Sequence, residues 1–329
     1  MDKRYQQALI WLQTQQSMPD ARLSVASADA SFRRYFRVHT AQQSYILMDA
    51  PPDKENSSLF VTIAQALSRL DVHAPTIYAA DLELGFLLLE DLGDRTYLDE
   101  LKDEPNKLYS DALAALVKLQ HGEINSTNNT IETYDKNRLQ SEMDLFEDWF
   151  IKRHLGLNLQ PAQVATLGRI QRYLIDTCLT QPQVWVHRDF HSRNLMITDR
   201  NSPGVIDFQD LVVGPLAYDL ASIFKDCYIA WPRSRQLTWL REYQQLANDM
   251  LDLPQFSFDE LVRWYDLTGL QRHLKVLGIF CRLNYRDNKP NYLNDLPMVA
   301  NYVIEVIDLY PELQEFGLHF RPMIESATA

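Results

Sequence analysis

The sequence is poor in the features that mark secreted, membrane-spanning and disulfide-bonded proteins. It has only three cysteines, which lie far apart and lack the spacing of a metal site or a disulfide framework. We therefore expect three buried, reduced thiols. No apolar run reaches the roughly 18 residues that a membrane span requires. The N-terminal segment predicts a polar amphipathic helix instead of a signal peptide. These absences predict a cytoplasmic protein without membrane insertion.

Positive charge is also scarce. The 329 residues include 32 Lys and Arg against 44 Asp and Glu, which gives a net charge of −12. An acidic balance of this kind argues against nucleic acid or an anionic membrane as a partner. The length suits one large domain or two ordinary ones. The oligomeric state stays open at this stage.

The most informative stretch runs from residue 186 to residue 210. Asp189 follows a short apolar segment, Asn194 comes five positions later, and Asp207 follows a further pair of apolar segments separated by the turn residues 201–204. Such a pattern predicts a β-hairpin. Its two strands would hold Asn194 and Asp207 close together.

These three side chains have the spacing of a phosphoryl-transfer site. Residues 187–194 match the kinase catalytic-loop pattern H-R-D-x-x-x-x-N. Phosphoryl transfer requires a carboxylate that orients the acceptor hydroxyl, and oxygen ligands for Mg²⁺ on the phosphates of ATP. Asp189 is the candidate catalytic base, and Asn194 and Asp207 are the candidate metal ligands. The competing interpretation, that Asp and Asn only form turns, explains each residue but not their joint spacing.

Two details distinguish this chain from protein kinases. His191 lies two residues after Asp189, where protein kinases usually carry Lys, and no long activation loop follows Asp207. The chain therefore resembles the aminoglycoside phosphotransferase and choline kinase group, which phosphorylates small molecules. Within that group it is most similar to the bacterial cell-wall-recycling anomeric sugar kinases, which act on the C1 hydroxyl of N-acetylmuramate and N-acetylglucosamine. The matching blocks are residues 29–38, 45–52, 144–150, 186–221 and 270–290.

The resemblance implies an α+β, two-lobed, protein-kinase-like fold. A small β-rich N-lobe would cover residues 1–90, and a helical C-lobe would cover residues 91–329. It also implies ATP and Mg²⁺ as cofactors and an amino sugar as substrate, in peptidoglycan recycling. His187 would orient the catalytic loop by hydrogen bonding, and Asp219 would anchor the strand-to-helix turn. Two alternatives stay open: another small-molecule kinase, acting on an aminoglycoside, choline or homoserine, and a non-catalytic nucleotide-binding module.

Two departures from the kinase pattern concern the phosphates of ATP. The loop expected to cover them contains no glycine, and Met48 stands where kinases place a Lys. The next predicted helix has no Glu to pair with such a Lys. The cation would come from Arg33 or Arg34, with Arg37 and Lys54 as further candidates, although each is equally suited to a solvated surface. The predicted nucleotide-binding residues are Ser27, Ala28, Asp29, Ser31, Arg33, Arg34 and, through the main chain at the hinge between lobes, Glu90 and Leu92.

Two predicted helices carry the candidate sugar contacts. An amphipathic helix over residues 135–155 places Glu142 near its apolar face and Trp149 where it could stack on a sugar ring. Phe146 and Phe150 on the same face are expected in the core. A second helix, over residues 257–286, carries a stripe of basic side chains that forms either an anion site or ion pairs with surplus Asp and Glu. The predicted substrate-binding residues are Glu142, Trp149, Arg188, Asp210, Gln271 and Lys275.

Overall fold

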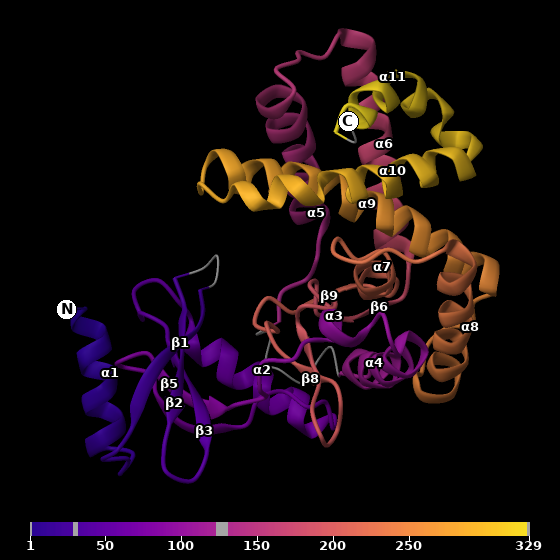
Figure 1. Cartoon of the computed structure of the whole chain (residues 1–329). Coiled ribbons are helices and arrows are strands. Elements are labelled where there is room, and N and C mark those ends of the chain that lie inside the picture. The colour runs from indigo at the N-terminus through magenta and orange to yellow at the C-terminus, as the bar shows by residue number, and fades with distance from the viewer. Residues whose placement is uncertain (1, 29–31, 123–130, 328–329) are drawn as a thin grey trace. The chain divides into compact units, whose positions relative to one another are not determined.

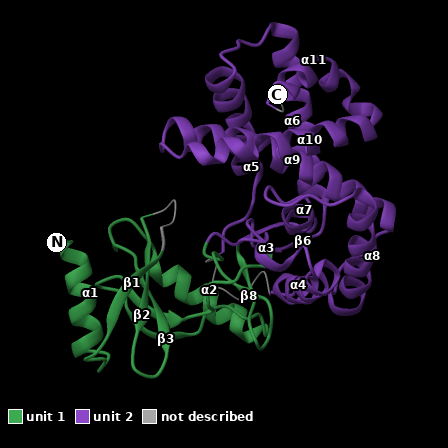
Figure 2. Ribbon diagram, in the orientation of Figure 1, with its two compact units in different colours: residues 1–97, 194–209 green, residues 98–193, 210–329 purple. Residues whose placement is uncertain are grey.

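The computed structural model describes residues 2–28, 32–122 and 131–327, which form two compact units (Figure 1). Unit 1 comprises residues 1–97 and 194–209, and unit 2 comprises residues 98–193 and 210–329 (Figure 2). The chain thus passes between the units three times, whereas the sequence predicted one crossing near residue 90. The additional crossings fall inside the stretch 186–210, because its hairpin belongs to unit 1.

Unit 1 is built on a five-stranded antiparallel sheet with the order β1-β2-β3-β5-β4. Helix α1 covers the sheet with Ala8, Trp11 and Leu12, which pack in one core cluster with Phe36 and Phe86. The elements of the unit are α1 (Lys3–Thr14), β1 (Arg22–Ala28), β2 (Arg34–His39), β3 (Ser44–Asp49), α2 (Ser57–Arg69), β4 (Ile77–Asp81), β5 (Phe86–Glu90), β7 (Leu195–Met196) and β8 (Gly204–Val205).

Helix α2 and the hairpin β7–β8 contact each other within unit 1. The Asn56 side chain caps α2 by accepting a hydrogen bond from the Leu59 N–H at 3.2 Å, which satisfies a backbone donor that the helix itself leaves open. The Phe60 ring of α2 lies 4.7 Å from the Phe208 ring, and the Val205 N–H donates to the His73 carbonyl at 2.7 Å. These contacts fix the hairpin on the remainder of the unit.

Unit 2 is mostly helical and is organised around α9. This 28-residue helix begins with a capping box, in which Ser257 and Glu260 exchange hydrogen bonds with each other's backbone N–H groups. The elements of the unit are α3 (Tyr97–Glu100), α4 (Pro105–Gln120), α5 (Lys136–Leu145), η1 (Phe146–His154), α6 (Pro161–Thr180), β6 (Gln183–Val186), β9 (Val212–Pro215), α7 (Tyr218–Phe224), α8 (Arg233–Met250), α9 (Phe258–Tyr285), η2 (Pro290–Asp295), α10 (Leu296–Leu309), η3 (Pro311–Leu313) and α11 (Gln314–Glu325).

Three elements differ from their sequence-based predictions. The helix predicted over residues 135–155 continues as a nine-residue π-helix, η1, after Leu145. Ser27 and Ala28, which were expected in the loop over the phosphates, belong to a strand, because β1 extends to Ala28. Helix α11 was not predicted, since Pro311 precedes it and Pro322 lies inside it, and both signal helix termination. A π-helix of this length is rare and frequently marks a functional region.

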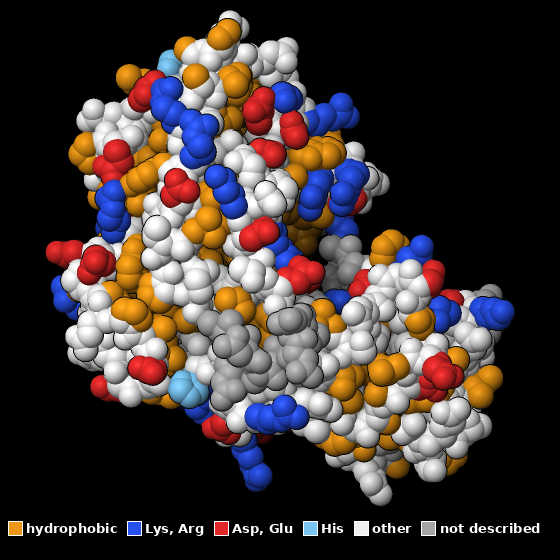
Figure 3. Space-filling view, turned by 180° about the vertical axis from the view of Figure 1, so that it is seen from behind, with side chains coloured by type: hydrophobic (Ala, Val, Ile, Leu, Met, Phe, Trp, Pro, Cys, Tyr) orange, Lys and Arg blue, Asp and Glu red, His pale blue; other side chains and the backbone are white. Residues whose placement is uncertain are grey.

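The composition-based expectations agree with the described residues. Cys178, Cys227 and Cys281 are all free and buried, as predicted. Within residues 2–28, 32–122 and 131–327, no helix is long and apolar enough to span a membrane. On the face shown in Figure 3, acidic and basic side chains are intermixed.

Candidate active site

Asp189 lies in the loop after β6, and two buried carboxylates of unit 2 hold the backbone of this loop. Asp219 Oδ2 accepts a hydrogen bond from the His187 N–H at 2.7 Å, and its Oδ1 accepts one from the Arg188 N–H at 3.0 Å. Asp226 Oδ2 accepts from the Ser192 N–H at 3.0 Å. Both carboxylates are fully buried. Asp219 was predicted to anchor the strand-to-helix turn, whereas the structure shows that its carboxylate holds the backbone of the catalytic loop. Asp226 is a second anchor of this loop that the sequence analysis missed.

The electrostatics of the loop favour an ionised Asp189. Burial by itself raises the pKa of its carboxyl, but the charges of Lys275, His191 and Arg272 outweigh burial and hold the pKa below its ordinary value. Asp219 behaves differently, because burial dominates there and raises the pKa to about 7. The loop therefore carries the half-buried Asp189, whose carboxylate stays charged. It is anchored by Asp219, whose pKa lies near neutrality.

Three of the predicted substrate-binding residues form one cluster. The Arg188 guanidinium donates to Glu142 Oε1 at 2.7 Å, and Lys275 Nζ lies 3.2 Å from Glu142 Oε2. The Tyr134 hydroxyl also donates to Glu142, and Lys275 donates to the Tyr218 hydroxyl at 2.8 Å. Burial alone raises the pKa of Glu142, yet Lys275 and Arg188 lower it overall. The structure thus brings together residues from α5, the catalytic loop and α9.

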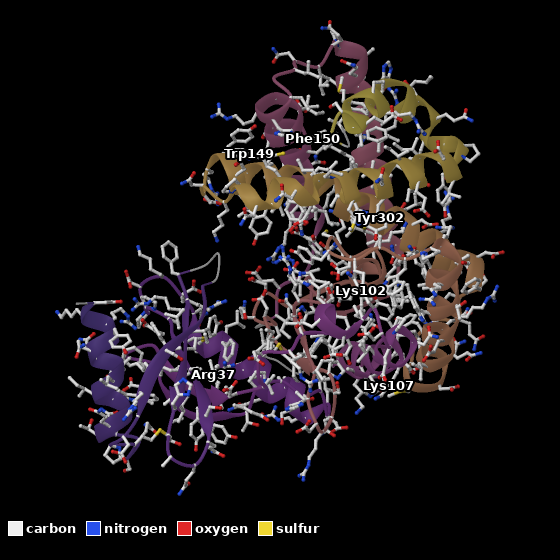
Figure 4. The ribbon with its side chains drawn as sticks, in the orientation of Figure 1. Arg37, Lys102, Lys107, Trp149, Phe150 and Tyr302 are labelled. Atoms are coloured by element: carbon white, nitrogen blue, oxygen red, sulfur yellow. The ribbon has the colours of Figure 1, made fainter. Side chains whose placement is uncertain are left out.

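The other three predicted substrate residues lie elsewhere in unit 2. Gln271 is fully buried on α9, one turn before Lys275, and its amide nitrogen and oxygen have no hydrogen-bond partner among the described residues. Trp149 lies on η1 (Figure 4) and lines a surface hollow together with Arg153 and Tyr285. Asp210 is exposed. Phe146 and Phe150 are completely buried in the core, as predicted.

Asn194 and Asp207 lie side by side on the hairpin of unit 1. The Ile206 N–H donates to the Asn194 carbonyl at 3.1 Å, and Asn194 Nδ2 donates to Asp207 Oδ2 at 3.3 Å. Gln209 Nε2 donates to Asp207 Oδ1 at 2.5 Å. The predicted closeness of Asn194 and Asp207 is confirmed. Asp207 also has a φ of +64°, a conformation that non-glycine residues adopt mainly where structure or function demands it.

The donor set on the hairpin suits Mg²⁺. Asn194 and Asp207 are half-buried and offer a carboxylate and an amide oxygen, the hard ligands that this ion prefers. Within the described residues, no group of three or more His, Cys, Asp or Glu side chains could hold a metal ion by itself. An ion bound here would complete its coordination with water and nucleotide phosphate, which is the usual arrangement for Mg²⁺.

The candidate phosphate cations all have carboxylate partners. Arg33 Nη2 lies 2.8 Å from Glu55 Oε2, just before α2. Arg34 donates to Asp49 through Nε at 3.0 Å and also pairs with Asp2. Because Asp49 is fully buried, the Arg34 pair contributes to the structure of the sheet. Among these two arginines, Arg33 is therefore the better candidate for a phosphate contact.

The remaining nucleotide candidates are distributed over unit 1. Met48, which stands at the strand position where kinases place a Lys, is completely buried. This position therefore supplies no charge for the phosphates. Arg37 pairs with Asp91 at 2.7 Å (Figure 4), and Lys54 is exposed, 3.8 Å from Asp53. Ser27 and Ala28 lie in β1, and their backbone pairs with that of β2. Asp29 and Ser31 lie outside the described residues.

The predicted hinge lines a hollow in unit 1. The hollow measures about 490 Å³ and is lined by residues 90–95, residues 197–200 and His73. The Glu90 N–H donates to the Thr76 carbonyl at 2.8 Å, so only its carbonyl could serve an adenine. Leu92 is half-buried at the same hollow.

Several site residues escaped the sequence analysis because their signal is spatial. Asp226, Tyr134 and Tyr218 are far from the catalytic loop in sequence, and nothing in the motif indicates them. Glu55 was missed because it precedes α2, whereas kinases carry the corresponding Glu inside the helix. Gln209 could have been noticed, since it lies two residues from Asp207.

Comparison with known proteins agrees with the motif. Residues 22–256 match the model of the phosphotransferase enzyme family. The chain is 46% identical over 327 residues to the N-acetylmuramate/N-acetylglucosamine kinase of Pseudomonas putida, which covers 96% of this chain and 95% of the relative. It is 42% identical to the protein of the same name from Pseudomonas aeruginosa, with 96% of each chain covered.

A solved structure supports the fold. The Plasmodium vivax ethanolamine kinase superposes with a TM-score of 0.65 over 93% of this chain and 88% of that chain, at 13% sequence identity. A likeness at this identity concerns the fold alone. The predicted α+β, kinase-like fold, with an antiparallel sheet near the N-terminus and a mostly helical remainder, is confirmed.

Proposed function

The chain belongs to the phosphotransferase enzyme family, and on this premise we propose that it phosphorylates N-acetylmuramate and N-acetylglucosamine with ATP. The acceptor would be the anomeric C1 hydroxyl and the product a sugar 1-phosphate, formed during the recycling of cell-wall sugars. The observation that carries the proposal is the nearly full-length similarity to relatives that bear the name of this kinase. The residue types and sequence spacing of Asp189, Asn194 and Asp207 support the matching chemistry.

Asp189 is the catalytic residue in this proposal. Its carboxylate stays ionised because neighbouring cations lower its pKa. It accepts the hydrogen bond of the sugar hydroxyl, orients the oxygen toward the phosphorus and takes the proton as the new bond forms. An anomeric hydroxyl is more acidic than an ordinary alcohol, so a carboxylate with a low pKa is a sufficient base. Asp219 and Asp226 position the loop through its backbone.

Asn194 and Asp207 would hold Mg²⁺, which offsets phosphate charge when it is bound. The hairpin fixes the two side chains against each other, and Gln209 orients the Asp207 carboxylate. Arg33 would contact a phosphate by exchanging its Glu55 partner for the nucleotide. A guanidinium suits this role because it binds a phosphate through two parallel hydrogen bonds.

A substrate panel tests the proposal. The purified protein is incubated with ATP, Mg²⁺ and, in turn, N-acetylmuramate, N-acetylglucosamine, an aminoglycoside, choline and homoserine, and ADP release is followed. We expect turnover only with the two sugars, and ³¹P NMR should show a phosphate coupled to the anomeric proton. Turnover with choline, homoserine or an aminoglycoside alone would assign the chain to another kinase of the group. No turnover with any acceptor would favour a nucleotide-binding module.

A further inference from the structure

One part of the basic stripe on α9 has no role in the proposed reaction. Gln271, Lys275, Gly278 and Arg282 follow one another at intervals of four, three and four residues, so they lie along one face of the helix. Lys275 belongs to the cluster around Glu142. Arg282 lies two turns further on, about 10 Å along the helix axis.

This face of α9 packs against the junction of α5 and η1. A Cβ at Gly278 would lie 2.3 Å from the Leu145 carbonyl oxygen, which means that only glycine permits this approach of the two backbones. Further along, His154 Nδ1 lies 3.1 Å from the Tyr285 hydroxyl. Arg282 therefore occupies the part of α9 between these two contacts, opposite the π-helix that carries Trp149.

The Arg282 guanidinium has no acidic partner among the described residues. Its Nε atom is buried and makes no hydrogen bond there. The nearest candidates are engaged elsewhere: Glu142 holds Arg188 and Lys275, and Asp287 is bound by both Nε and Nη2 of Arg286 at 2.7 and 2.8 Å. Burial, together with the charge of Arg286, lowers the pKa of Arg282. The half-buried guanidinium is compensated only partly by the charges of Asp287 and Glu142 and leaves a buried N–H unsatisfied. Such a group is costly and is therefore suited to an anionic ligand.

The two sugars of the proposed function differ in one charged group. N-acetylmuramate carries a lactyl ether on C3 that ends in a carboxylate, whereas N-acetylglucosamine has a hydroxyl there. The excess of cations along α9 suits this carboxylate, and Trp149, Tyr285 and Arg286 line a hollow at the C-terminal end of this helix. The span from Lys275 to Arg282 is comparable to a sugar ring with one extended substituent.

We propose that Arg282 is the residue that recognises the carboxylate of N-acetylmuramate and so distinguishes it from N-acetylglucosamine. This inference rests on the proposed function and adds the basis of its substrate preference. The guanidinium donates two hydrogen bonds to the carboxylate, which is the pairing that its planar geometry favours. Arg282 does not touch the reacting atoms, so it contributes to binding and not to the chemical step.

The test compares both sugars with wild-type protein and the variants Arg282→Gln and Arg282→Lys. Loss of a charged hydrogen-bonding pair should raise the KM for N-acetylmuramate about 10- to 100-fold in Arg282→Gln, with little change in kcat. The KM for N-acetylglucosamine should stay within about twofold of wild type, and this activity also shows that the variant folds. Arg282→Lys should restore part of the binding. The matched control Arg263→Gln removes a cation of α9 that Glu312 already neutralises, and it should leave both KM values unchanged.

A modified substrate completes the test. Conversion of the lactyl carboxylate to an amide should cost the wild-type enzyme the same factor in KM and cost Arg282→Gln nothing more. Equal losses for both sugars, or no loss with N-acetylmuramate, would overturn the assignment of Arg282. If wild-type protein phosphorylates neither sugar, the proposed function itself fails, and that result is distinct from a failure of Arg282 alone.

Discussion

The two halves of the stretch 186–210 are held in place in different ways. Residues 186–193 in unit 2 depend on buried carboxylates from distant elements, since Asp219 and Asp226 accept hydrogen bonds from the loop backbone. Residues 194–209 in unit 1 are held on that unit through Phe60 and His73, but the Asp207 side chain is fixed by local hydrogen bonds from two amide side chains of the same stretch. The backbone of the first half is therefore sensitive to substitutions of single distant carboxylates, whereas the Asp207 side chain is sensitive mainly to residues of its own stretch.

This contrast distinguishes residues proposed to take part in the reaction from residues that position them. A substitution of Asp207 should remove function without affecting the fold, because the residue is half-buried and held by neutral amides. A substitution of Asp219 should affect the loop geometry and its pH dependence together, because a fully buried carboxylate bonds two backbone N–H groups. The four predictions below test this contrast, beginning with the largest expected effect.

Asp207→Ala should reduce Mg²⁺-dependent turnover to background. The variant loses the only carboxylate among the proposed metal ligands, and a neighbouring amide cannot replace its charge. The thermal unfolding midpoint of the protein without ligands should stay close to that of wild type. Asp20→Ala, which removes an exposed carboxylate of unit 1 outside the proposed site, is the control and should keep full activity. An unfolded Asp207→Ala protein would show that Asp207 is structural.

Asp189→Asn should lower kcat by roughly 10²- to 10⁴-fold, the range typical of a lost general base. Nucleotide affinity, measured by calorimetry with a non-hydrolysable ATP analogue, should be largely unchanged. The substitution keeps the shape of the side chain, so the loop should retain its hydrogen bonds. Nearly normal turnover in a folded variant would contradict the assignment of Asp189 as the base.

Asp219→Asn should lower kcat about 100-fold, because an amide oxygen cannot accept both loop N–H groups as the carboxylate does and one buried donor loses its partner. The variant should also change the pH dependence of stability. Burial raises the folded-state pKa of Asp219 from 3.8 to about 7, so the folded protein binds this proton more tightly than the unfolded protein. Its contribution to the free energy of unfolding is complete below pH 3.8 and is lost as the pH rises through 7.

Urea unfolding between pH 4 and pH 8 measures this contribution. Wild-type protein should lose stability over that range relative to Asp219→Asn, which has no proton to release. Asp210→Asn, an exposed carboxylate in the same region of the sequence, is the control and should follow wild type. Parallel stability curves for wild type and Asp219→Asn would show that Asp219 does not titrate in this window.

The sequence predicted the local parts of the site better than the long-range parts. Asn194 and Asp207 could be placed together because a turn between two apolar segments determines the hairpin. Asp226, Tyr134 and Tyr218 could not be predicted, because their contacts depend on how the helices of unit 2 pack. The π-helix was also invisible to the sequence, since an amphipathic pattern does not distinguish it from an α-helix.

Arg33→Ala should have the smallest effect of the four, raising the KM for ATP and lowering kcat/KM roughly tenfold to a hundredfold. The estimate corresponds to the loss of one charged hydrogen-bonding contact of about 1.5–3 kcal/mol. Arg33 pairs with Glu55, which it can exchange for a phosphate. Arg34 holds the buried Asp49, so Arg34→Ala should lower the thermal midpoint and leave the KM for ATP nearly unchanged. Glu55→Gln removes the carboxylate of this pair and keeps Arg33, so it should keep or improve ATP affinity. Steady-state kinetics on the three variants decide the question.

If Arg33→Ala behaves like wild type, the phosphate cation lies elsewhere. Arg37 and Lys54 are then the next side chains to replace, because both lie in unit 1 together with the hairpin.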